Sequence, residues 1–406
     1  MKIKKAAAFL LSLFMLGSTI NMSYSVSAEA SDMITEEYSD AAYQQTLEEI
    51  KKGLDNCESE IKITAKIHKD ELYPIFEKLI STDKDYFYVK KYLGYSFING
   101  YVCSIKFKYL IPAEELDEAK KSFNSRFEEF VGCVDESMTD FQKCMAVHDK
   151  LALECEYDSK LEQISYTSYG ALVEGKAVCQ GYSMAYAQIL TALGIEADII
   201  SSESMGHMWN MVKLNEKWYH VDVTYDDPLP EIAGKVRHIN FMNSSEKMAE
   251  LDYSFADNEA PHIAGSVIYD KAFWKDIDNR IVHKGSEMFF AQEGYIRSYD
   301  TVSKKGKTLH TVDDVWEIYG TNSFYEGVYP GVELYGNKLY FNSSDTVYSY
   351  DLETEEISEI KTVSTQKGNL YGLYIMNGKL YAVSKTTPAT SDSGKWRSIA
   401  ETAELD

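Results

Sequence analysis

Residues 175–194 read GKAVCQGYSMAYAQILTALG and place a lone cysteine, Cys179, directly before a helical run. Apolar residues recur at helical spacing from residue 178 to residue 193, and Gly194 follows where helices commonly end. The pattern predicts a helix with Cys179 at its N-terminus. Backbone amides and the helix dipole stabilise a thiolate there, so Cys179 is a candidate nucleophile. Taken alone, Cys179 is better explained as a buried structural thiol, and the catalytic interpretation depends on partner residues elsewhere in the chain.

A nucleophilic cysteine needs a base and a residue that orients the base. His207 begins the apolar stretch HMWNMVKL, which is predicted to be a strand. Asp222 lies in the next predicted strand, within KWYHVDVTY at 217–225. Gly175 and Gly181, on either side of Cys179, are expected to leave room for a substrate backbone.

The turn between these two strands decides whether His207 and Asp222 can meet. A two- or four-residue turn centred on Asn215 and Glu216 places Trp209 opposite Asp222, with His207 on the same face. His207 and Asp222 are then diagonal neighbours, with Cα atoms about 7–8 Å apart. Asp222 could orient the imidazole ring at that separation. A three-residue turn would instead move Asp222 to the opposite face.

Other polar residues in this part of the chain have simpler interpretations. His148 and Asp149 could form a second acid–base site, but neighbouring helical residues point to different faces, so a structural role is favoured. We expect His220 on the face opposite Asp222, as a packing or surface residue. Asp226 and Asp227 precede a proline and indicate turn or cap chemistry rather than a metal site.

Length and composition indicate the general class of protein and its number of domains. The chain has 406 residues, 45% hydrophobic and 26% charged, which is typical of a folded protein with more than one domain. Residues 1–30 combine a lysine-rich start, an apolar run of about a dozen residues and small residues at the end, which predicts a secretory signal peptide. No later stretch is long and apolar enough for membrane insertion. The net charge of −23 argues against nucleic acid as a partner.

Six cysteines are scattered through the chain without a CxxC pair. This spacing predicts neither a small disulfide scaffold nor a zinc site, and we expect no metal and no cofactor. If Cys179 stays reduced, the remaining five cannot all pair. Most of them are expected to be buried thiols that pack as small hydrophobic groups.

The residue pattern of the sequence changes along the chain. Residues 31–135 predict a small α+β region, with a hairpin turn at Asn99-Gly100. Residues 136–284 contain the candidate site, and residues 285–395 predict short tyrosine-rich strands. There the motif GNKLYF recurs as NGKLYA at an offset of 41 residues. That period is typical of β-propeller blades, but too few units fit to close a ring, so we expect a small all-β domain.

Three ordered blocks together resemble the transglutaminase-like superfamily in its secreted bacterial form. The blocks are GKAVCQGYSMAYAQILTALGIEA, GHMWNMVKLNEKWYHVDVTYDDP and RHINFMNSSEKM, and they cover roughly residues 140–250. The resemblance implies an α+β, cysteine-protease-like core with a papain-like triad of Cys179, His207 and Asp222. The family includes protein cross-linkers, peptidases, amidases and inactive relatives, so the resemblance does not fix the reaction.

The expected activity follows from this resemblance. Cys179 would attack a peptide or amide carbonyl to form a thioester, and hydrolysis is favoured over transfer to an amine. Tyr169 could contribute to an oxyanion hole and Trp209 could shield the site, although core packing explains both. The expected substrate is a protein or peptide in the cell wall or outside the cell. The alternatives are a cross-linking transglutaminase and a non-catalytic surface or adhesion protein that keeps the fold.

Overall fold

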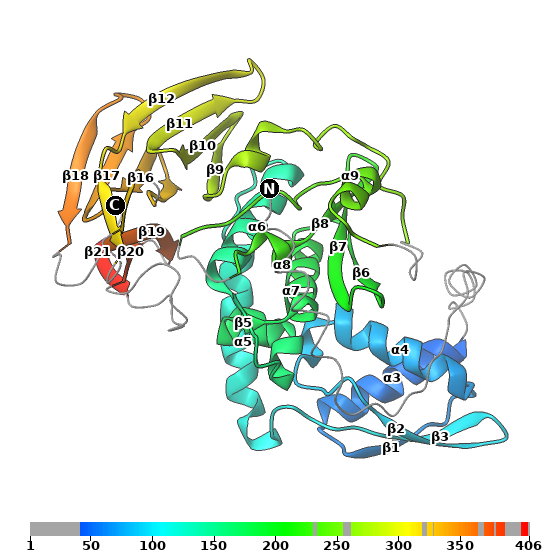
Figure 1. Ribbon diagram of the computed structural model, residues 1–406. Coiled ribbons are helices and arrows are strands. Elements are labelled where there is room, and N and C mark those ends of the chain that lie inside the picture. Colours follow the sequence, from blue (N-terminus) through cyan, green and yellow to red (C-terminus); the bar gives the residue numbers. More distant parts are fainter. Residues whose placement is uncertain are drawn as a thin grey trace. The chain divides into compact units, whose positions relative to one another are not determined.

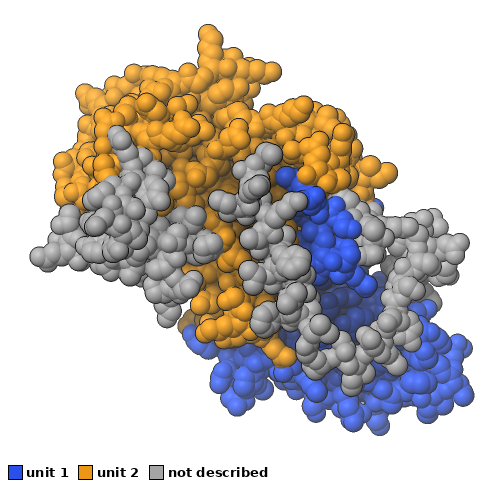
Figure 2. Space-filling view, in the orientation of Figure 1, with its two compact units in different colours: residues 1–120, 200–208, 251–261 blue, residues 121–199, 209–250, 262–406 orange. Residues whose placement is uncertain are grey.

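The computed structural model describes residues 41–229, 234–254, 261–318, 323–327, 329–363, 369–376, 379–385 and 399–404. The predicted signal peptide at 1–30 lies outside these residues. The chain forms two compact units, shown in Figure 2. The first comprises residues 1–120, 200–208 and 251–261, and the second comprises residues 121–199, 209–250 and 262–406. Helices and antiparallel sheets are mixed throughout, so the chain has the predicted α+β class.

The first unit combines two helices with a three-stranded sheet. Its elements are α3 (Ala41–Asp55), β1 (Glu60–Lys62), α4 (Lys69–Thr82), β2 (Gly94–Ile98) and β3 (Tyr101–Lys106), and the strand order is β1-β3-β2. Apolar residues from both helices and from the sheet are buried together, among them Leu54, Phe76 and Ile105. Asn99 and Gly100 both have positive φ, as a tight hairpin turn requires, so the predicted hairpin is confirmed.

Three longer helices carry most of the second unit's helical part. They are α5 (Leu116–Val131), α6 (Asp140–Glu154) and α7 (Cys179–Ala192) (Figure 1). Thr139 caps α6 in a capping box with Gln142. Helix α7 is buried almost all round, and the hydroxyl of Tyr186 donates to the carbonyl of Cys144 in α6 at 3.0 Å. The helix that carries Cys179 is therefore held inside the core.

A three-stranded sheet follows α7. Its strands are β6 (Ala197–Ser202), β7 (His207–Leu214) and β8 (Lys217–Val221), in that order. The turn between β7 and β8 consists of Asn215 and Glu216, both with positive φ, and Leu214 pairs with Lys217. This is the two-residue turn that gives the predicted register. The predicted strand over 222–225 is wrong, because these residues cap and form a helical turn, α8 (Val223–Asp226).

Shorter elements connect these parts. The parallel pair β4 (Glu156–Tyr157) and β5 (Lys176–Ala177) precedes α7, and α9 (Ser245–Glu250) follows α8. The 3₁₀-helices are η1 (Lys84–Tyr86), η2 (Ala113–Glu115), η3 (Gln163–Tyr166) and η5 (Phe273–Asp276), and η4 (Gly170–Glu174) is a π-helix. In the described part of the chain, none of the helices has the length and apolar character needed to cross a membrane.

The C-terminal part is built from antiparallel sheets in which consecutive strands are neighbours (Figure 1). Two sheets have four strands each, in the orders β12-β11-β10-β9 and β15-β16-β17-β18. Smaller sheets are β13-β14 and β19-β20-β21. The bounds are β9 (Ile281–Lys284), β10 (Glu287–Gln292), β11 (Tyr295–Asp300), β12 (Lys305–Thr311), β13 (Val315–Ile318), β14 (Ser323–Glu326), β15 (Val332–Tyr335), β16 (Lys338–Asn342), β17 (Thr346–Asp351), β18 (Ile357–Thr362), β19 (Asn369–Met376), β20 (Lys379–Lys385) and β21 (Ile399–Glu404).

Two apolar clusters lie in the β-sheets. One contains Phe289, Trp316 and Phe341, and the other contains Leu370, Leu380 and Ala382. The Trp316 indole donates to the carbonyl of Leu370 at 2.5 Å. The repeated KLYF and KLYA motifs form β16 and β20. The outer strands β12 and β18 are largely exposed. An all-β region is therefore present, whereas its likeness to propeller blades is not confirmed.

Candidate functional site

Cys179 is the first residue of α7 and is partly exposed, while the rest of the helix is mostly buried. Val178, which precedes it, gives the helix no side-chain cap. The first amide groups of a helix have no partner within the helix, so they attract negative charge. A thiolate or an oxyanion at this helix end therefore has uncapped donors close by. All six cysteines are free thiols.

The glycines beside Cys179 allow the backbone to turn and to pack closely against neighbouring segments. A Cβ on Gly181 would lie 2.5 Å from the carbonyl oxygen of Ser165 and 2.9 Å from that of Thr167. Gly175 has a φ of +65° and ends the π-helix η4 in the left-handed conformation. The expectation that Gly181 leaves room for a substrate is therefore wrong, because the 165–167 backbone occupies that space.

Three tyrosines from separate segments lie around Cys179. Tyr157 pairs in β4 with Ala177, two residues before the cysteine, and Gln180 donates its side-chain amide to the carbonyl of Tyr166 at 3.1 Å. Burial, followed by the nearby charge of Cys179, raises the pKa of Tyr157 to about 12. Burial, followed by the charges of Asp222 and Cys179, also raises the pKa of Tyr225. Sequence reasoning missed this tyrosine group, because only contacts between distant segments bring it together.

Asp222 is the N-cap residue of α8. Its Oδ1 accepts the backbone amide of Tyr225 at 3.1 Å, and its own amide donates to the carbonyl of Asn240 at 3.0 Å. The side chain is almost completely buried. Asp222 and Cys179 both lie near enough to Tyr225 for their charges to raise its pKa.

His207 opens β7 and belongs to the first unit, whereas Cys179 and Asp222 belong to the second. Within its own unit, the buried His207 ring lies 6.3 Å from the ring of Tyr253. Its assignment as the base therefore stays a prediction.

The remaining sequence-predicted side chains are packed in the interior or at its edge. Trp209 is buried and its indole donates to Nδ1 of His220 at 3.1 Å. The expectation that His220 points away from the face of Asp222 is wrong, since residues two apart on a strand share a face and His220 contacts Trp209. Burial lowers the pKa of His220 to about 4. Tyr169 stacks on Phe123 at 6.4 Å.

A comparison with protein families matches residues 131–223 to the model described as the transglutaminase-like superfamily. The match ends one residue after Asp222 and includes Cys179 and His207. These residues form a transglutaminase-like domain. In a comparison with curated proteins, none matched this chain.

Solved structures similar to this chain include "Crystal structure of a TGase", which is 15% identical with a TM-score of 0.23 and covers 41% of this chain. This chain spans half of that protein's length. The N-terminal domain of Nup159 is 11% identical with a TM-score of 0.21, covering 46% of this chain and 38% of its own. A computationally designed protein, Ika8, is 10% identical with a TM-score of 0.19, covering 26% and 31%. These scores are too low to support an argument about function.

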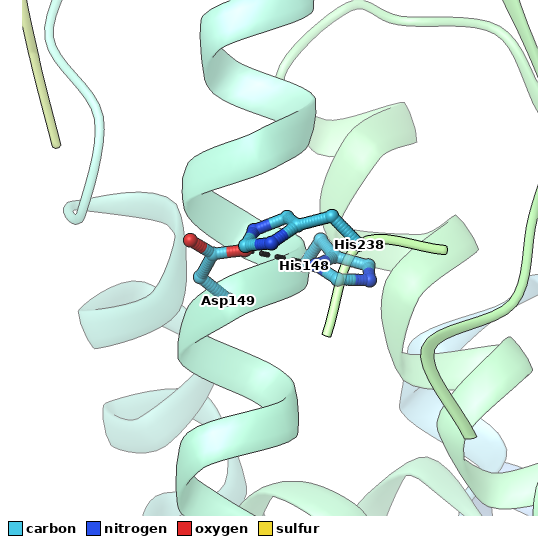
Figure 3. Close-up of side chains that lie close together, drawn as sticks. All are labelled: His148, Asp149 and His238. Atoms are coloured by element: carbon cyan, nitrogen blue, oxygen red, sulfur yellow. Dashed lines mark hydrogen bonds and ion pairs between the residues drawn. The ribbon is translucent and has the colours of Figure 1, made fainter. Parts of the chain in front are cut away.

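A buried cluster that sequence reasoning did not find joins the transglutaminase-like domain to the residues that follow it. His148 Nδ1 and His238 Nε2 each lie 2.9 Å from Oδ1 of Asp149, as Figure 3 shows. His148 Nε2 lies 3.1 Å from Oδ2 of Asp226. The structural role expected for His148 and Asp149 fits this packing, although their side chains meet instead of pointing apart. Asp226 lies in the helical turn α8, as expected, and its carboxylate also pairs with His148. The sequence signal for this cluster was the polar pair His148 and Asp149 in the middle of the apolar helix α6.

The cluster strongly perturbs its ionisable groups. Burial alone would lower the pKa of His148, but hydrogen bonds to Asp149 and Asp226 raise it to about 9. Burial alone would raise the pKa of Asp149, but His238 and His148 hold it well below its usual range. His148 is therefore expected to carry a positive charge at neutral pH, between two carboxylates.

Ligand atoms of His148, Asp149 and His238 come within 4.8 Å of one another, which raises the question of a metal ion. Two ligand atoms about 2.0–2.1 Å from a tetrahedral ion would lie about 3.3 Å apart. The observed 2.9 Å between each histidine nitrogen and Asp149 is instead a hydrogen-bond distance. Among the described residues, this group supplies only three ligand atoms, and all three side chains are fully buried. The geometry fits protons better than a metal ion.

Proposed function

We propose that this protein is a thiol enzyme that acts on peptide or amide bonds through Cys179, His207 and Asp222. The observation that carries the proposal is the position of Cys179. It is the partly exposed first residue of a buried helix whose N-terminus lacks a side-chain cap, inside a transglutaminase-like domain. Such a helix end favours both a thiolate and the oxyanion that forms when it attacks a carbonyl.

The proposed reaction proceeds through a thioester. His207 takes the thiol proton, and Sγ of Cys179 attacks the carbonyl carbon to give a tetrahedral intermediate. The C–N bond then breaks, and His207 donates the proton to the leaving amine. Water, deprotonated by His207, attacks the thioester, and the carboxylic acid leaves as the thiol re-forms. Asp222 orients the imidazole ring throughout.

Hydrolysis is the favoured outcome because water is abundant and no amine-binding feature is visible among the described residues. The three tyrosines near Cys179 supply aromatic faces and hydroxyl groups that suit a peptide or amide substrate. Asp158 and Asp222, close to the same group, add negative charge that disfavours acidic substrates.

The first test is pulse alkylation of the folded protein at about pH 6, with mass spectrometry to locate the label. Fast labelling of Cys179 that is lost in the His207→Ala variant supports an activated thiolate. Exposed Cys57 and Cys103 serve as internal references, since both are partly exposed free thiols. A Cys179 that reacts no faster than these two contradicts the proposal and favours a non-catalytic binding protein.

A second assay separates the two enzymatic outcomes. A peptidase creates new N-termini in a peptide library, and Cys179→Ala abolishes them. A cross-linking transglutaminase instead incorporates a labelled primary amine into a glutamine-rich protein. The appearance of only the second product would replace hydrolysis by amine transfer as the reaction.

We also propose that the protein is secreted after cleavage of residues 1–30, on the basis of the charge and apolar pattern of that segment. N-terminal sequencing of the protein recovered from the culture medium would place the mature start near residue 30. Recovery only from the cell interior, with Met1 retained, would contradict this.

A further inference from the structure

The buried cluster around His148 is connected directly to the backbone that holds Asp222. Asp226, at the end of α8, is completely buried. Its carboxylate accepts the backbone amide of Asn240 at 2.9 Å and the Asn240 side-chain amide at 3.0 Å. The carbonyl of Asn240 in turn accepts the amide of Asp222 at 3.0 Å. Asn240 therefore fixes both ends of the helical turn whose first residue is Asp222.

The two histidines of the cluster each have an acceptor at both ring nitrogens. His148 lies between the carboxylates of Asp149 and Asp226, at 2.9 and 3.1 Å. His238 lies between Asp149, at 2.9 Å, and the carbonyl of Ile277, at 2.8 Å. A carbonyl and an ionised carboxylate can only accept hydrogen bonds, so each nitrogen must donate. A neutral imidazole has one N–H, and its other lone pair would face an acceptor oxygen.

The charge of the cluster balances when both imidazoles are protonated. Two imidazolium ions then face two carboxylates, and no net charge is buried. The other Asp149 oxygen, Oδ2, accepts the backbone amide of Ile281 at 2.9 Å. Ile281 begins β9, so the cluster also attaches the first strand of the β-rich region to α6.

We propose that His148, Asp149, Asp226 and His238 form a charge-balanced network, with both histidines doubly protonated, that positions Asp222 for the reaction proposed above. These four are positioning residues, since they act through α8 and Asn240. The inference rests on the proposed function for its catalytic consequence. The protonation of the histidines is a separate property that can be measured without a substrate.

Charged and titratable groups from the surrounding elements also act on the network. They are Tyr186 of α7, Lys275 of η5, Arg280, His283 of β9 and Glu333 of β15. Burial lowers the pKa of His283 to about 4, so it stays neutral and adds no positive charge at neutral pH. Burial raises the pKa of Glu333, which binds Arg280, to about 7, so Arg280 keeps positive charge that acts on Asp149. Lys275 adds positive charge near Asp226, so the two carboxylates of the network face these two groups as well as its own imidazolium groups.

The protonation state is tested by histidine side-chain ¹⁵N NMR on the intact protein between pH 5.5 and 7.5. Of the eight histidines, His148 and His238 are expected to show both ring nitrogens protonated, as their acceptors require, and the His148 signal is expected to persist over the whole range. The Asp226→Asn variant should change one of these two spectra, which assigns it to His148. Loss of all doubly protonated signals by pH 7.5 overturns the proposal. A stoichiometric metal ion whose removal by a chelator shifts the same signals also overturns it.

The positioning role is tested by the alkylation rate of Cys179 in Asp226→Asn, with Asp227→Asn as the matched control. Asp227 is adjacent and similarly buried, but its carboxylate accepts the hydroxyl of Tyr182, which an asparagine oxygen can also do. A displaced Asp222 should slow His207-dependent labelling at pH 6 by about 10- to 100-fold. The control should slow it by less than about twofold, because its bond persists. Circular dichroism confirms that both variants are folded.

The outcomes separate the two proposals. Equal labelling in Asp226→Asn and the wild-type protein overturns the positioning role while leaving the proposed function intact. A wild-type Cys179 with no enhanced reactivity contradicts the proposed function and, with it, the catalytic consequence of the network. The histidine spectra decide the protonation state in either case. If Asp226→Asn does not fold, His148→Gln provides the same comparison.

Discussion

Replacing Gly181 by alanine tests the packing at the first turn of α7. The new Cβ would lie 2.5 Å from the carbonyl oxygen of Ser165, 2.9 Å from that of Thr167 and 2.9 Å from Cβ of Ala177. Two of these atoms belong to the backbone, so they cannot rotate away as a flexible side chain can. Either the helix end that carries Cys179 or the 165–167 segment must move.

The expected energy is the difference between two opposing terms. Overpacking of a dense interior costs about 1–3 kcal/mol, because neighbouring atoms leave their preferred positions. Alanine in place of glycine inside a helix returns up to about 1 kcal/mol. Gly181→Ala should therefore lower the free energy of unfolding by about 1–2 kcal/mol. With a slope near 3 kcal/mol/M, the urea midpoint should fall by about 0.3–0.7 M.

Urea unfolding followed by tryptophan fluorescence measures this midpoint. Ser183→Ala, two residues further along the same helix, is the control. The Ser183 hydroxyl bonds only the carbonyl of Cys179 within its own helix, so its loss should be nearly neutral. A Gly181→Ala protein that is more stable than the wild type would refute the close approach of the 165–167 backbone.

Further outcomes follow from other contacts. The folded pKa of His148, about 9, exceeds its ordinary value of 6.5, so the stabilisation from its charge should be complete below pH 6.5 and be lost as pH rises through 9. The free energy of unfolding, measured in urea, should be about 3 kcal/mol lower at pH 9 than at pH 6. A urea midpoint that does not fall would contradict the paired imidazolium. Glu216→Gly should raise the unfolding free energy by up to about 1 kcal/mol in the same assay, since Glu216 has a φ of 61°, and a decrease would argue against a strained turn. Trp316→Phe should lower the melting temperature by removing the hydrogen bond to Leu370 from a buried core, and an unchanged melting temperature would show that this bond contributes little.

Local signals in the sequence predicted much of the framework. Gly194 follows the end of α7, and the Asn215-Glu216 turn sets the register of β7 and β8. Each of these depends on residues only a few positions apart, so turn and cap chemistry is sufficient to predict them.

Long-range polar contacts were not predictable in the same way. His148 meets Asp226 and Asp149 meets His238 across 78 and 89 residues. Periodicity says which side of a helix is apolar, but it does not say which distant carboxylate will neutralise a buried histidine. The strand predicted over 222–225 failed for a related reason, because capping by Asp222 outweighed the β-propensity of Val223, Thr224 and Tyr225.

The exposed outer strands of the β-rich region affect how copies of this protein behave at high concentration. Among the described residues, β12 and β18 are end strands of their sheets, so each has an edge that another sheet could join. Lys305 and Lys307 lie on β12, and Glu359 and Lys361 lie on β18. Bringing a second sheet against either edge would force these charged groups out of water. The charged side chains on these outer strands thus act as a barrier to edge-to-edge polymerisation.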